Sequence, residues 1–384
     1  MPLISIVIPT RNRLYYLKDT LKSVLDQRSP DIEIIVADNA TQDGTREYLA
    51  SLGDAIRVVR SETPLSMSDN WDKALAEVRG DWVTFCGDDD CLMPDYVVEA
   101  RLAIEAYPAT EGIFWDTPIY RWPSSINENE RNFLTFSLRS QSRTISSKET
   151  LRRMYEEIVN IMMPPGLYHG LVKTTVIRRA KELWGEFRLG KVPDLGSGIV
   201  FLSLTESYVM LGRPLSVMAF GSQSTGMSHK NAKPDFGPRL EFQQLSRPDD
   251  LAAKYPLIDV DNPNILQWRL LLDWADYLRP RGTELNLNNT KMLLYCIERL
   301  AAIPECDRED SATKLLAFCV KFGMPQAQAE GLIHKGLNRP YGFRPGQNYR
   351  QEGDFTELRL GINLGRTPIK TATGAAGLIA GHFS

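Results

Sequence analysis

The sequence predicts an α/β protein with a mostly parallel sheet flanked by helices, followed by a mainly α-helical C-terminal region. Over the first hundred residues, buried β-branched runs alternate with segments whose apolar residues recur at helical spacing. This alternation requires right-handed crossovers and therefore favours a parallel sheet. Beyond about residue 247 helical spacing predominates, and proline and glycine separate the segments.

Each element of the first hundred residues has its own signal. The run LISIVIP at residues 3–9 is typical of a strand that is buried on both faces. Ser66 or Ser68 is expected to cap the third helix. Strands are expected over residues 3–9, 32–37, 55–59 and 82–86, and helices over residues 15–27, 45–52, 69–78 and 94–106.

The pattern is weaker after residue 112. Residues 113–122 indicate a strand or hairpin, and residues 127–144 give no clear assignment. We place a domain boundary near residue 235, which divides the chain into domains 1–235 and 236–384. The small-residue tail 361–384 is expected either to lack order or to pack on a partner. Further strands are expected over residues 171–176 and 215–220, and further helices over residues 147–159, 199–210, 265–278, 289–302, 311–322 and 326–337.

Composition excludes several classes of protein. The chain has 384 residues and a net charge of −3, so nothing favours a nucleic-acid binder. The N-terminal apolar stretch is too short for a signal peptide, and no run is long enough to span a bilayer, so we expect a cytoplasmic protein. The five cysteines have no framework or zinc-site spacing and are expected to be reduced.

Polar residues follow three of the predicted strands, at the point where each strand ends. These are Thr10–Arg13, Asp38–Asn39 and Gly87–Asp90. Ligands of parallel α/β sheets bind at the carboxyl ends of the strands. We therefore expect the three loops to meet at one rim of the sheet.

The run Asp88–Asp90 is the strongest local feature. Three crowded carboxylates are costly unless a cation neutralises them, and oxygen ligands suit Mg²⁺ or Mn²⁺. In extended backbone alternate side chains face the same way, so Asp88 and Asp90 are expected to point into the site and Asp89 away from it. The alternative is a solvated acidic turn, or Asp90 as the cap of the next helix.

Each of the other polar residues at the rim could either bind a ligand or have a structural role. Asp38 can accept a hydrogen bond from the edge of a nucleobase, and Asn39 can both donate and accept. Thr10 and Arg11 could contact a base, ribose or phosphate, or Thr10 could cap a helix. Asn70 and Lys73 lie one helical turn apart, where a lysine could neutralise phosphate or simply carry surface charge.

The segments SIVIPTRNR, IIVADNATQDGT and SMSDNWDKALAEVRGDWVTFCGDDD together resemble the family 2 glycosyltransferases of the GT-A fold, a Rossmann-like fold. The resemblance is good over residues 3–100 and weaker to about residue 230. It implies inverting transfer from a nucleotide-diphosphate sugar, with a UDP-sugar favoured, to a saccharide or glycoconjugate acceptor in polysaccharide synthesis. It also implies one Mn²⁺ or Mg²⁺ ion.

By this resemblance Asp38 is the base-binding carboxylate, and Asp88 and Asp90 flank the diphosphate and metal. Asp89 occupies the variable middle position. The donor residues implied or proposed are Pro9, Thr10, Arg11, Arg13, Asp38, Asn39, Asn70, Lys73, Asp88 and Asp89.

Inverting transfer also requires a general base to deprotonate the acceptor hydroxyl. Asp194, in the glycine-rich stretch before a predicted helix, is the first choice, although aspartate is also a common helix cap. Glu186 and Asp116 are the alternatives. The chain lacks the acidic dipeptide followed by an aromatic residue that many family members carry, so the sequence leaves the choice of base open. His229 is proposed to complete the metal shell, and His169 to touch the acceptor, although both could be ordinary loop histidines.

The first loop and the acidic residues also bear on other functions. A sugar-nucleotide pyrophosphorylase or a dehydrogenase would carry a glycine-rich loop after the first strand, and PTRNR has no glycine. A catalytically degenerate scaffold that binds nucleotide-sugar remains the alternative. The sequence leaves open whether residues 236–384 bind the acceptor, form a homo-oligomer or contact a membrane surface peripherally.

Overall fold

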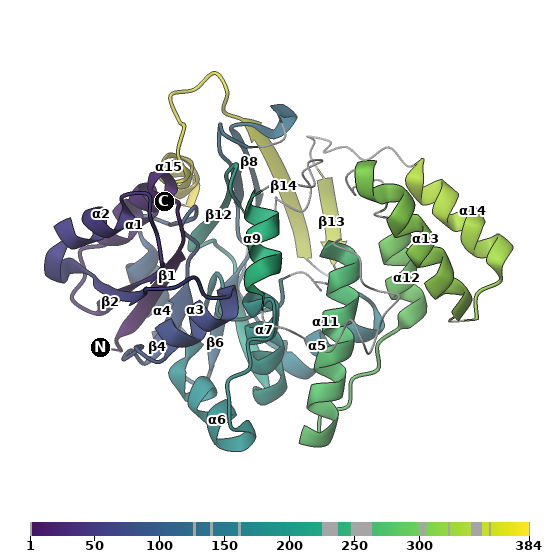
Figure 1. Cartoon of the computed structure of the whole chain (residues 1–384). Helices are drawn as coiled ribbons and strands as arrows, with labels where there is room; N and C mark the ends of the chain where they lie inside the picture. The colour runs from purple at the N-terminus through teal and green to yellow at the C-terminus, as the bar shows by residue number, and fades with distance from the viewer. Residues whose placement is uncertain are drawn as a thin grey trace. The chain divides into compact units, whose positions relative to one another are not determined.

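The computed structural model of the chain divides into two compact units (Figure 1). The first consists of Met1–Lys148, Pro165–Ser224 and Arg344–Ser384, and the second of Glu149–Pro164 and Thr225–Phe343. Residues 344–384 therefore group with the N-terminal unit and not with the helices that precede them. The structure describes residues 2–125, 128–138, 141–159, 163–224, 237–246, 263–298, 300, 305–321, 323–338, 348–352 and 355–383.

An eight-stranded sheet forms the centre of the first unit. Strands β1, β2, β3 and β4 are parallel, as predicted, and β10 runs antiparallel between β4 and β6. The mixed α/β fold with a mostly parallel N-terminal sheet is thus confirmed. The strand order is β3 (Arg57–Ser61), β2 (Ile32–Asn39), β1 (Ile4–Thr10), β4 (Trp82–Phe85), β10 (Gly170–Lys173), β6 (Gly112–Trp115), β11 (Ser207–Leu211) and β9 (Arg143–Ser146).

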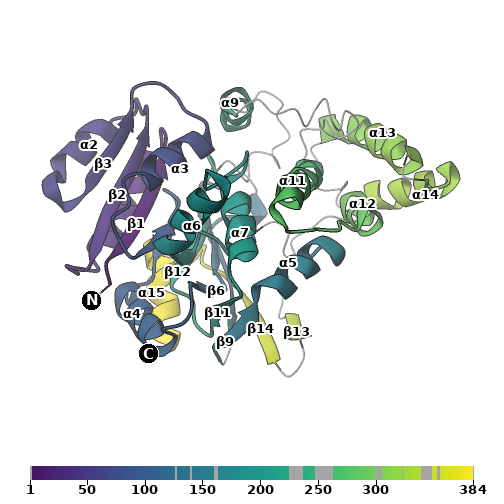
Figure 2. The ribbon, with the colours of Figure 1, turned by 90° about the horizontal axis from the view of Figure 1, so that it is seen from below.

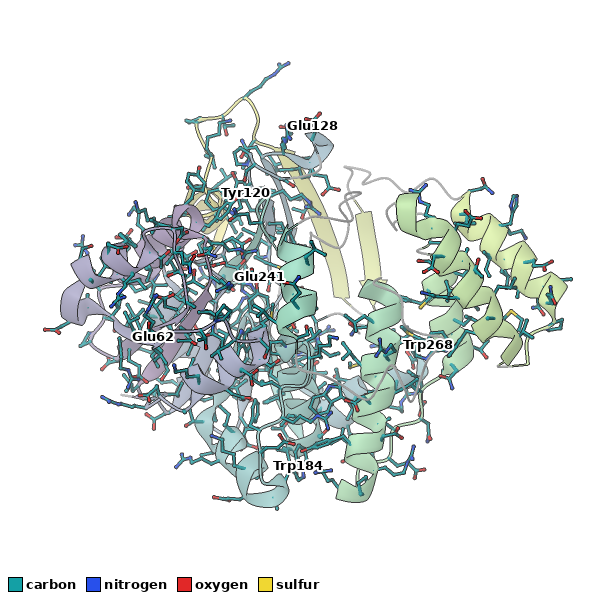
Figure 3. All side chains as sticks on the ribbon, in the orientation of Figure 1. Glu62, Tyr120, Glu128, Trp184, Glu241 and Trp268 are labelled. Atoms are coloured by element: carbon teal, nitrogen blue, oxygen red, sulfur yellow. The ribbon has the colours of Figure 1, made fainter. Side chains whose placement is uncertain are left out.

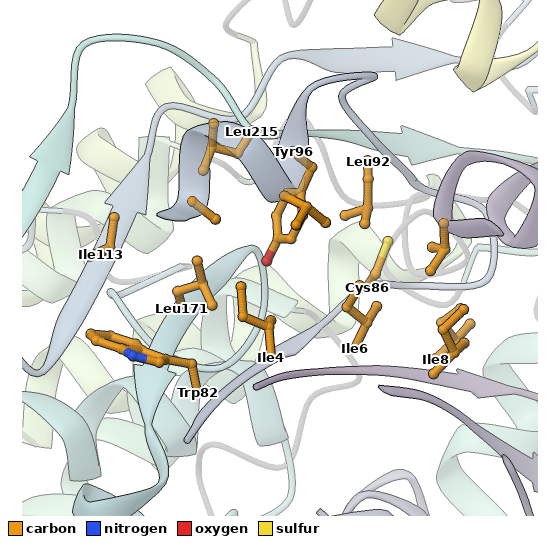
Figure 4. Close-up of a cluster of buried hydrophobic side chains, with 14 of the residues drawn as sticks. Ile4, Ile6, Ile8, Trp82, Cys86, Leu92, Tyr96, Ile113, Leu171 and Leu215 are labelled. Atoms are coloured by element: carbon orange, nitrogen blue, oxygen red, sulfur yellow. The ribbon is translucent and has the colours of Figure 1, made fainter. Parts of the chain in front are cut away.

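Helices cover both faces of this sheet because its strands are apolar on both sides. Ile4, Ile6 and Ile8 alternate along β1 and belong to one buried cluster with side chains of α1 and α4 (Figure 4). On the other face Trp71 of α3 stacks on Phe85, with ring centroids 4.1 Å apart. The helices are α1 (Leu14–Leu25), α2 (Thr45–Ser51), α3 (Met67–Leu75), α4 (Tyr96–Ala106), α6 (Thr174–Trp184) and α7 (Pro193–Leu204), with α6 and α7 side by side (Figure 2).

A second sheet completes the first unit and includes two strands from the C-terminal region. β14 pairs antiparallel with β8, so residues more than 200 positions apart form one ladder. The stretch 113–122 is not a hairpin, because β6 joins the first sheet and β7 joins the second. The order is β13 (Asn348–Glu352), β14 (Phe355–Asn363), β8 (Phe133–Leu138), β7 (Ile119–Arg121), β12 (Ser216–Phe220) and β5 (Cys91–Leu92).

The C-terminal tail ends in helix α15 (Ala372–Phe383), which packs on its own unit. Ala375 and Ile379 are buried in a cluster with Tyr16 and Trp122. Asp19 of α1 accepts a 2.9 Å hydrogen bond from the backbone N–H at residue 373, in the first turn of α15. The small residues allow close packing, so the expectation that the tail lacks order is wrong, while its packing on a partner stays a prediction.

The second unit is helical in the part that the structure describes. Trp268 on α11 (Figure 3) and Trp274 are buried, as expected for core residues. None of the described helices is long and apolar enough to cross a membrane. The helices are α5 (Ser147–Glu156), which begins in the first unit, α9 (Gly237–Leu245), α11 (Pro263–Leu278), α12 (Asn289–Glu298), α13 (Glu305–Lys321) and α14 (Gln326–Leu337).

Candidate functional site

The loops after β1 and β4 meet at the carboxyl end of the first sheet. Thr10 Oγ1 donates a 2.8 Å hydrogen bond to Asp88 Oδ2. Arg13 Nη1 lies 2.7 Å from Asp88 Oδ1 and 3.6 Å from Asp89 Oδ1. The expected convergence of these two loops is confirmed, and its centre is the guanidinium of Arg13 between two carboxylates.

Asp90 has a different environment from its two neighbours. Its Oδ2 accepts hydrogen bonds from the Gly87 N–H at 2.8 Å and from the Tyr168 hydroxyl at 2.6 Å, and lies 3.1 Å from His169 Nε2. Its Oδ1 accepts a 2.7 Å hydrogen bond from the Ala219 N–H. Because these donors use the oxygens of a fully buried carboxylate, the geometry does not fit the prediction that Asp90 is a metal ligand.

Burial and charge act differently on the ionisable groups of the run. Burial raises the pKa of Asp89 to about 7; Arg13 opposes this rise, and the neighbouring carboxylates add to it. Burial also opposes ionisation of Asp90, but His169 together with the hydrogen bonds from Tyr168 and Ala219 outweighs it, so the pKa of Asp90 is lowered. Burial disfavours the charge of Arg13, yet Asp88 and Asp89 raise its pKa. The run is therefore a buried group of carboxylates that depends on a cation.

Residues 221–224 lie against the same carboxylates. Asp89 Oδ2 accepts a hydrogen bond from Ser224 Oγ and a 3.4 Å hydrogen bond from the Gly221 N–H. The second nitrogen of Arg13, Nη2, donates to the carbonyl oxygen of Gln223. Arg13 and Asp89 thus connect the first loop, the acidic run and the segment after β12.

Asp38 is the penultimate residue of β2, lies beside Thr10 in the parallel register and is fully buried. Its Oδ1 accepts hydrogen bonds from the N–H and the hydroxyl of Thr41, at 3.1 and 2.7 Å. Its Oδ2 accepts from Arg60 Nη1, and Arg60 is the partly exposed member of the pair. The pair presents a carboxylate and a guanidinium side by side.

Several of the other predicted donor residues make structural contacts. Asn39 pairs with the backbone of Leu65, donating at 2.9 Å and accepting at 2.8 Å. Arg11 donates to the Asn39 carbonyl at 2.7 Å, and Lys73 donates to a backbone carbonyl. Pro9 lies in β1 opposite residue 37.

Asn70 is buried and only half satisfied. Its amide nitrogen donates a 3.2 Å hydrogen bond to the Ala37 carbonyl. Its Oδ1 has no hydrogen-bond donor among the described residues. A buried unpaired acceptor is costly, so this oxygen is a candidate contact for a ligand.

Asp194 lies in the first turn of α7 and does not cap it, because the N-cap position is Val192 and Pro193 begins the helix. Its Oδ1 is buried without a hydrogen-bond donor in the described part of the chain. Burial raises the pKa of Asp194 to about 6, against the effect of backbone N–H groups. Ser197 accepts a 3.2 Å hydrogen bond from the Leu167 N–H, which ties this turn to the loop before β10.

Sequence reasoning did not find the roles of Thr41, Arg60, Tyr168 or Ser224. Each acts on a carboxylate through a contact that no local pattern reveals. His169, expected at the acceptor, instead sits between Asp90 and Ser216, 2.8 Å from the Ser216 hydroxyl, with a left-handed φ of 51°. His229 lies outside the described residues.

The oxygen atoms of the acidic run can be compared with the ligands that a divalent ion requires. Mg²⁺ and Mn²⁺ prefer oxygen ligands, and Mg²⁺ commonly uses one or two carboxylates together with substrate phosphates. Asp88 and Asp89 offer such oxygens at the rim. No group of three His, Cys, Asp or Glu side chains is arranged to hold a metal among the described residues. The residues fit an ion that is held by two carboxylates and completed by a phosphorylated substrate.

The chain is similar to several known proteins. Residues 5–160 match the model of the family "Glycosyl transferase family 2". TuaG of Bacillus subtilis (strain 168), a protein named for teichuronic acid biosynthesis, is 37% identical over 92 residues, which are 23% of this chain and 36% of TuaG. A "GalNAc(5)-diNAcBac-PP-undecaprenol beta-1,3-glucosyltransferase" of Campylobacter jejuni is 33% identical over 97 residues, 24% of this chain and 31% of that protein. The chain thus spans about a third of the length of these curated relatives.

Solved structures are similar only at a distance. S. aureus TarS 1–349 in complex with UDP-GlcNAc has a TM-score of 0.45 and 13% identity, over 87% of this chain and 89% of TarS 1–349. Mannosyltransferase PcManGT from Pyrobaculum calidifontis, in complex with GDP-Man and Mn²⁺, has a TM-score of 0.40 and 14% identity, over 88% and 87% of the two chains. A likeness of this degree does not bear on individual site residues.

Proposed function

We propose that the protein is an inverting glycosyltransferase, on the premise that residues 5–160 match the model of glycosyl transferase family 2. It moves a sugar from a nucleotide-diphosphate sugar to an acceptor hydroxyl in the synthesis of a polysaccharide or glycoconjugate. The observation that carries the proposal is the cluster of Thr10, Arg13, Asp88 and Asp89 at the ends of β1 and β4.

The Asp38–Arg60 pair is proposed to read the nucleobase. Thr41 supplies two hydrogen bonds to Oδ1 of Asp38, and Arg60 takes one position on Oδ2. A carboxylate has about four acceptor positions, so one remains for a single imide N–H, while Arg60 can face a base carbonyl. Uracil offers one imide N–H, whereas guanine would present two adjacent N–H groups to this carboxylate. The pair therefore favours a UDP-sugar over a GDP-sugar.

We propose that Arg13, Asp88 and Asp89 bind the diphosphate, Arg13 directly and the two aspartates through a divalent ion. A guanidinium forms strong paired hydrogen bonds with phosphate oxygens, so Arg13 would hold the leaving group. Asp88 and Asp89 would hold the Mn²⁺ or Mg²⁺ ion, which, when bound, supplies Lewis-acid stabilisation of the leaving diphosphate. Thr10 keeps Asp88 oriented through its 2.8 Å hydrogen bond.

Asp194 is the proposed general base. Its free Oδ1 can accept the proton of an acceptor hydroxyl, and its raised pKa makes it a stronger base than an ordinary carboxylate. A pKa of about 6 still leaves it mostly ionised at pH 7. Its place in the first turn of α7 gives it a fixed backbone.

A thermal-shift screen of UDP, GDP, TDP and CMP, each with and without Mn²⁺, tests this function. A ligand at about 100 times its dissociation constant should stabilise the native state by about 2.7 kcal/mol. We expect UDP with Mn²⁺ to raise Tm, Asp88→Ala to abolish that shift, and Asp54→Asn, at an exposed position of the same unit, to preserve it. Absence of a shift with every nucleotide in folded protein would reject the proposal.

A further inference from the structure

The acidic run already has a protein cation among its oxygens. Both oxygens of Asp88 are engaged, by Thr10 at 2.8 Å and by Arg13 at 2.7 Å. Asp89 Oδ2 accepts from Ser224 and the Gly221 N–H, and Asp89 Oδ1 faces Arg13 at 3.6 Å. Asp90 already accepts hydrogen bonds from Gly87, Tyr168 and Ala219. A divalent ion shared by Asp88 and Asp89 would therefore compete with Arg13 for Asp88 Oδ1 and Asp89 Oδ1, which Arg13 now contacts.

Arg13 and a divalent ion therefore compete for the same carboxylate oxygens. The side chain of Arg13 is 16% exposed and those of Asp88 and Asp89 are 4% and 7% exposed, so all three charges are largely removed from water. Buried carboxylates without a counter-ion are strongly destabilising. Arg13 therefore stabilises the protein without ligands, and its withdrawal is unfavourable unless another cation replaces it and another anion receives it.

The second nitrogen of Arg13 makes the exchange dependent on the segment after β12. Arg13 Nη2 donates to the Gln223 carbonyl while Ser224 donates to Asp89. Moving the guanidinium breaks its contact with this segment as well as its ion pair. A diphosphate is an anion that can accept both nitrogens of the guanidinium in compensation.

We propose that Arg13 is a resident counter-ion that keeps a divalent cation out of the acidic run until a nucleotide diphosphate draws the guanidinium away. This inference rests on the proposed function, because it assumes that the run serves a metal and a diphosphate. It predicts that metal binding without nucleotide is weak because of Arg13, and that nucleotide removes most of this handicap.

The test is a titration of the full chain with Mn²⁺ in the absence of nucleotide. Binding is measured as the decrease of the electron paramagnetic resonance signal of free Mn²⁺. We expect Arg13→Met to bind Mn²⁺ at least tenfold more tightly than the unmodified protein. The matched control is Arg46→Met in α2 of the same unit, because Arg46 is an exposed arginine that has no part in the proposed site. The control should stay within twofold of the unmodified protein.

Equal Mn²⁺ affinity of Arg13→Met and the unmodified protein would overturn the proposal, as would failure of the variant to bind Mn²⁺. If circular dichroism shows that Arg13→Met does not fold, Arg13→Lys provides the test. Lysine keeps the charge but lacks the planar fork that reaches two carboxylates. It should bind Mn²⁺ several-fold more tightly than the unmodified protein, and an unchanged affinity would again overturn the proposal.

Repeating the titration with UDP separates this proposal from the proposed function. UDP should tighten Mn²⁺ binding to the unmodified protein and narrow its difference from Arg13→Met to within threefold. A difference that persists at full size with UDP bound would reject the exchange. If UDP binds neither protein, the proposed function fails, while the titration without nucleotide still decides whether Arg13 excludes the ion.

Discussion

The hydroxyl of Tyr168 donates a 2.6 Å hydrogen bond to Oδ2 of Asp90, which joins the loop before β10 to the acidic run after β4. Asp90 also receives the N–H groups of Gly87 and Ala219. One carboxylate thus fixes three segments that are far apart in the sequence. Its main contribution is to hold the site together.

Replacement of Asp90 should therefore affect stability before it affects chemistry. In Asp90→Asn the side-chain NH₂ group would face N–H and O–H groups that are themselves donors, so hydrogen bonds would be lost. We expect the free energy of unfolding to fall by about 3 kcal/mol. Tyr168→Phe removes one of the donors and should cost about 1 kcal/mol. Urea denaturation without metal measures both, and an Asp90→Asn protein of unchanged stability would contradict the anchoring role.

Asp194→Asn should abolish most turnover. General-base catalysis contributes about 10²–10⁴-fold, so we expect kcat to fall by at least about 100-fold while the affinity for UDP is kept. The unmodified enzyme should lose kcat/KM below about pH 6, where Asp194 becomes protonated. Release of UDP measured across pH checks both. If the residual kcat/KM of the variant still falls below about pH 6, a group other than Asp194 causes that fall.

The same substitution should stabilise the protein above pH 6. The pKa of Asp194 rises from 3.8 in the unfolded chain to about 6 in the folded protein. Between these values the unfolded state binds fewer protons, so this group lowers stability as pH rises from about 4 to 6. Asp194→Asn should gain up to about 3 kcal/mol at pH 7.5 and almost nothing at pH 4. An equal difference at both pH values, by urea denaturation, would contradict the assignment.

Asn39 and Asp38 should separate into a structural and a ligand-binding residue. Asn39→Ala leaves the Leu65 N–H and carbonyl without their partner and should cost about 2 kcal/mol of stability, with UDP affinity within threefold. Asp38→Ala should weaken UDP binding at least tenfold. Calorimetric titration with UDP distinguishes the two variants. A large loss of UDP affinity in Asn39→Ala would show that Asn39 contacts the nucleotide.

Gly196 should be intolerant of a side chain. A Cβ at this position would lie 1.9 Å from the carbonyl oxygen of Leu189, so Gly196→Ala must displace the first turn of α7 with Asp194. We expect a loss of about 3 kcal/mol and a lower kcat. The matched control is Gly377→Ala in α15, where nothing lies within 4 Å; it should gain about 0.5–1 kcal/mol. Similar Tm values for both variants would contradict this prediction.

The elements of the first hundred residues were predictable because each carries its own periodicity and turn signals. Helix α3 even begins as expected, with Ser66 accepting a 3.0 Å hydrogen bond from the Asp69 N–H. The strands β8, β9, β11 and β14 were missed because their partners are remote in the sequence. The helix expected over residues 199–210 is wrong at its end, because residues 207–211 form a strand between β6 and β9.

The composition of the site was predictable from strand ends, but the role of each residue was not. The alternation argument required extended backbone through Asp88–Asp90. The run is instead a turn, in which the Asp90 N–H donates to the Gly87 carbonyl at 3.2 Å. Asp90 therefore points toward Tyr168 and Ala219, while Asp89 faces Arg13. Such a reversal depends on the loops that surround the turn, and no local spacing encodes them.

The contribution of β14 and α15 to the first unit affects how that unit can be made. The first β-α-β segments leave the ribosome early, yet the buried cluster that contains Tyr120, Trp122 and Leu134 is complete only when Ala375 and Ile379 arrive. Contacts at such long sequence separation slow folding. Translation must reach the end of α15 before this apolar surface is shielded, so a fragment ended at residue 235 would expose it and aggregate, however complete its catalytic residues are.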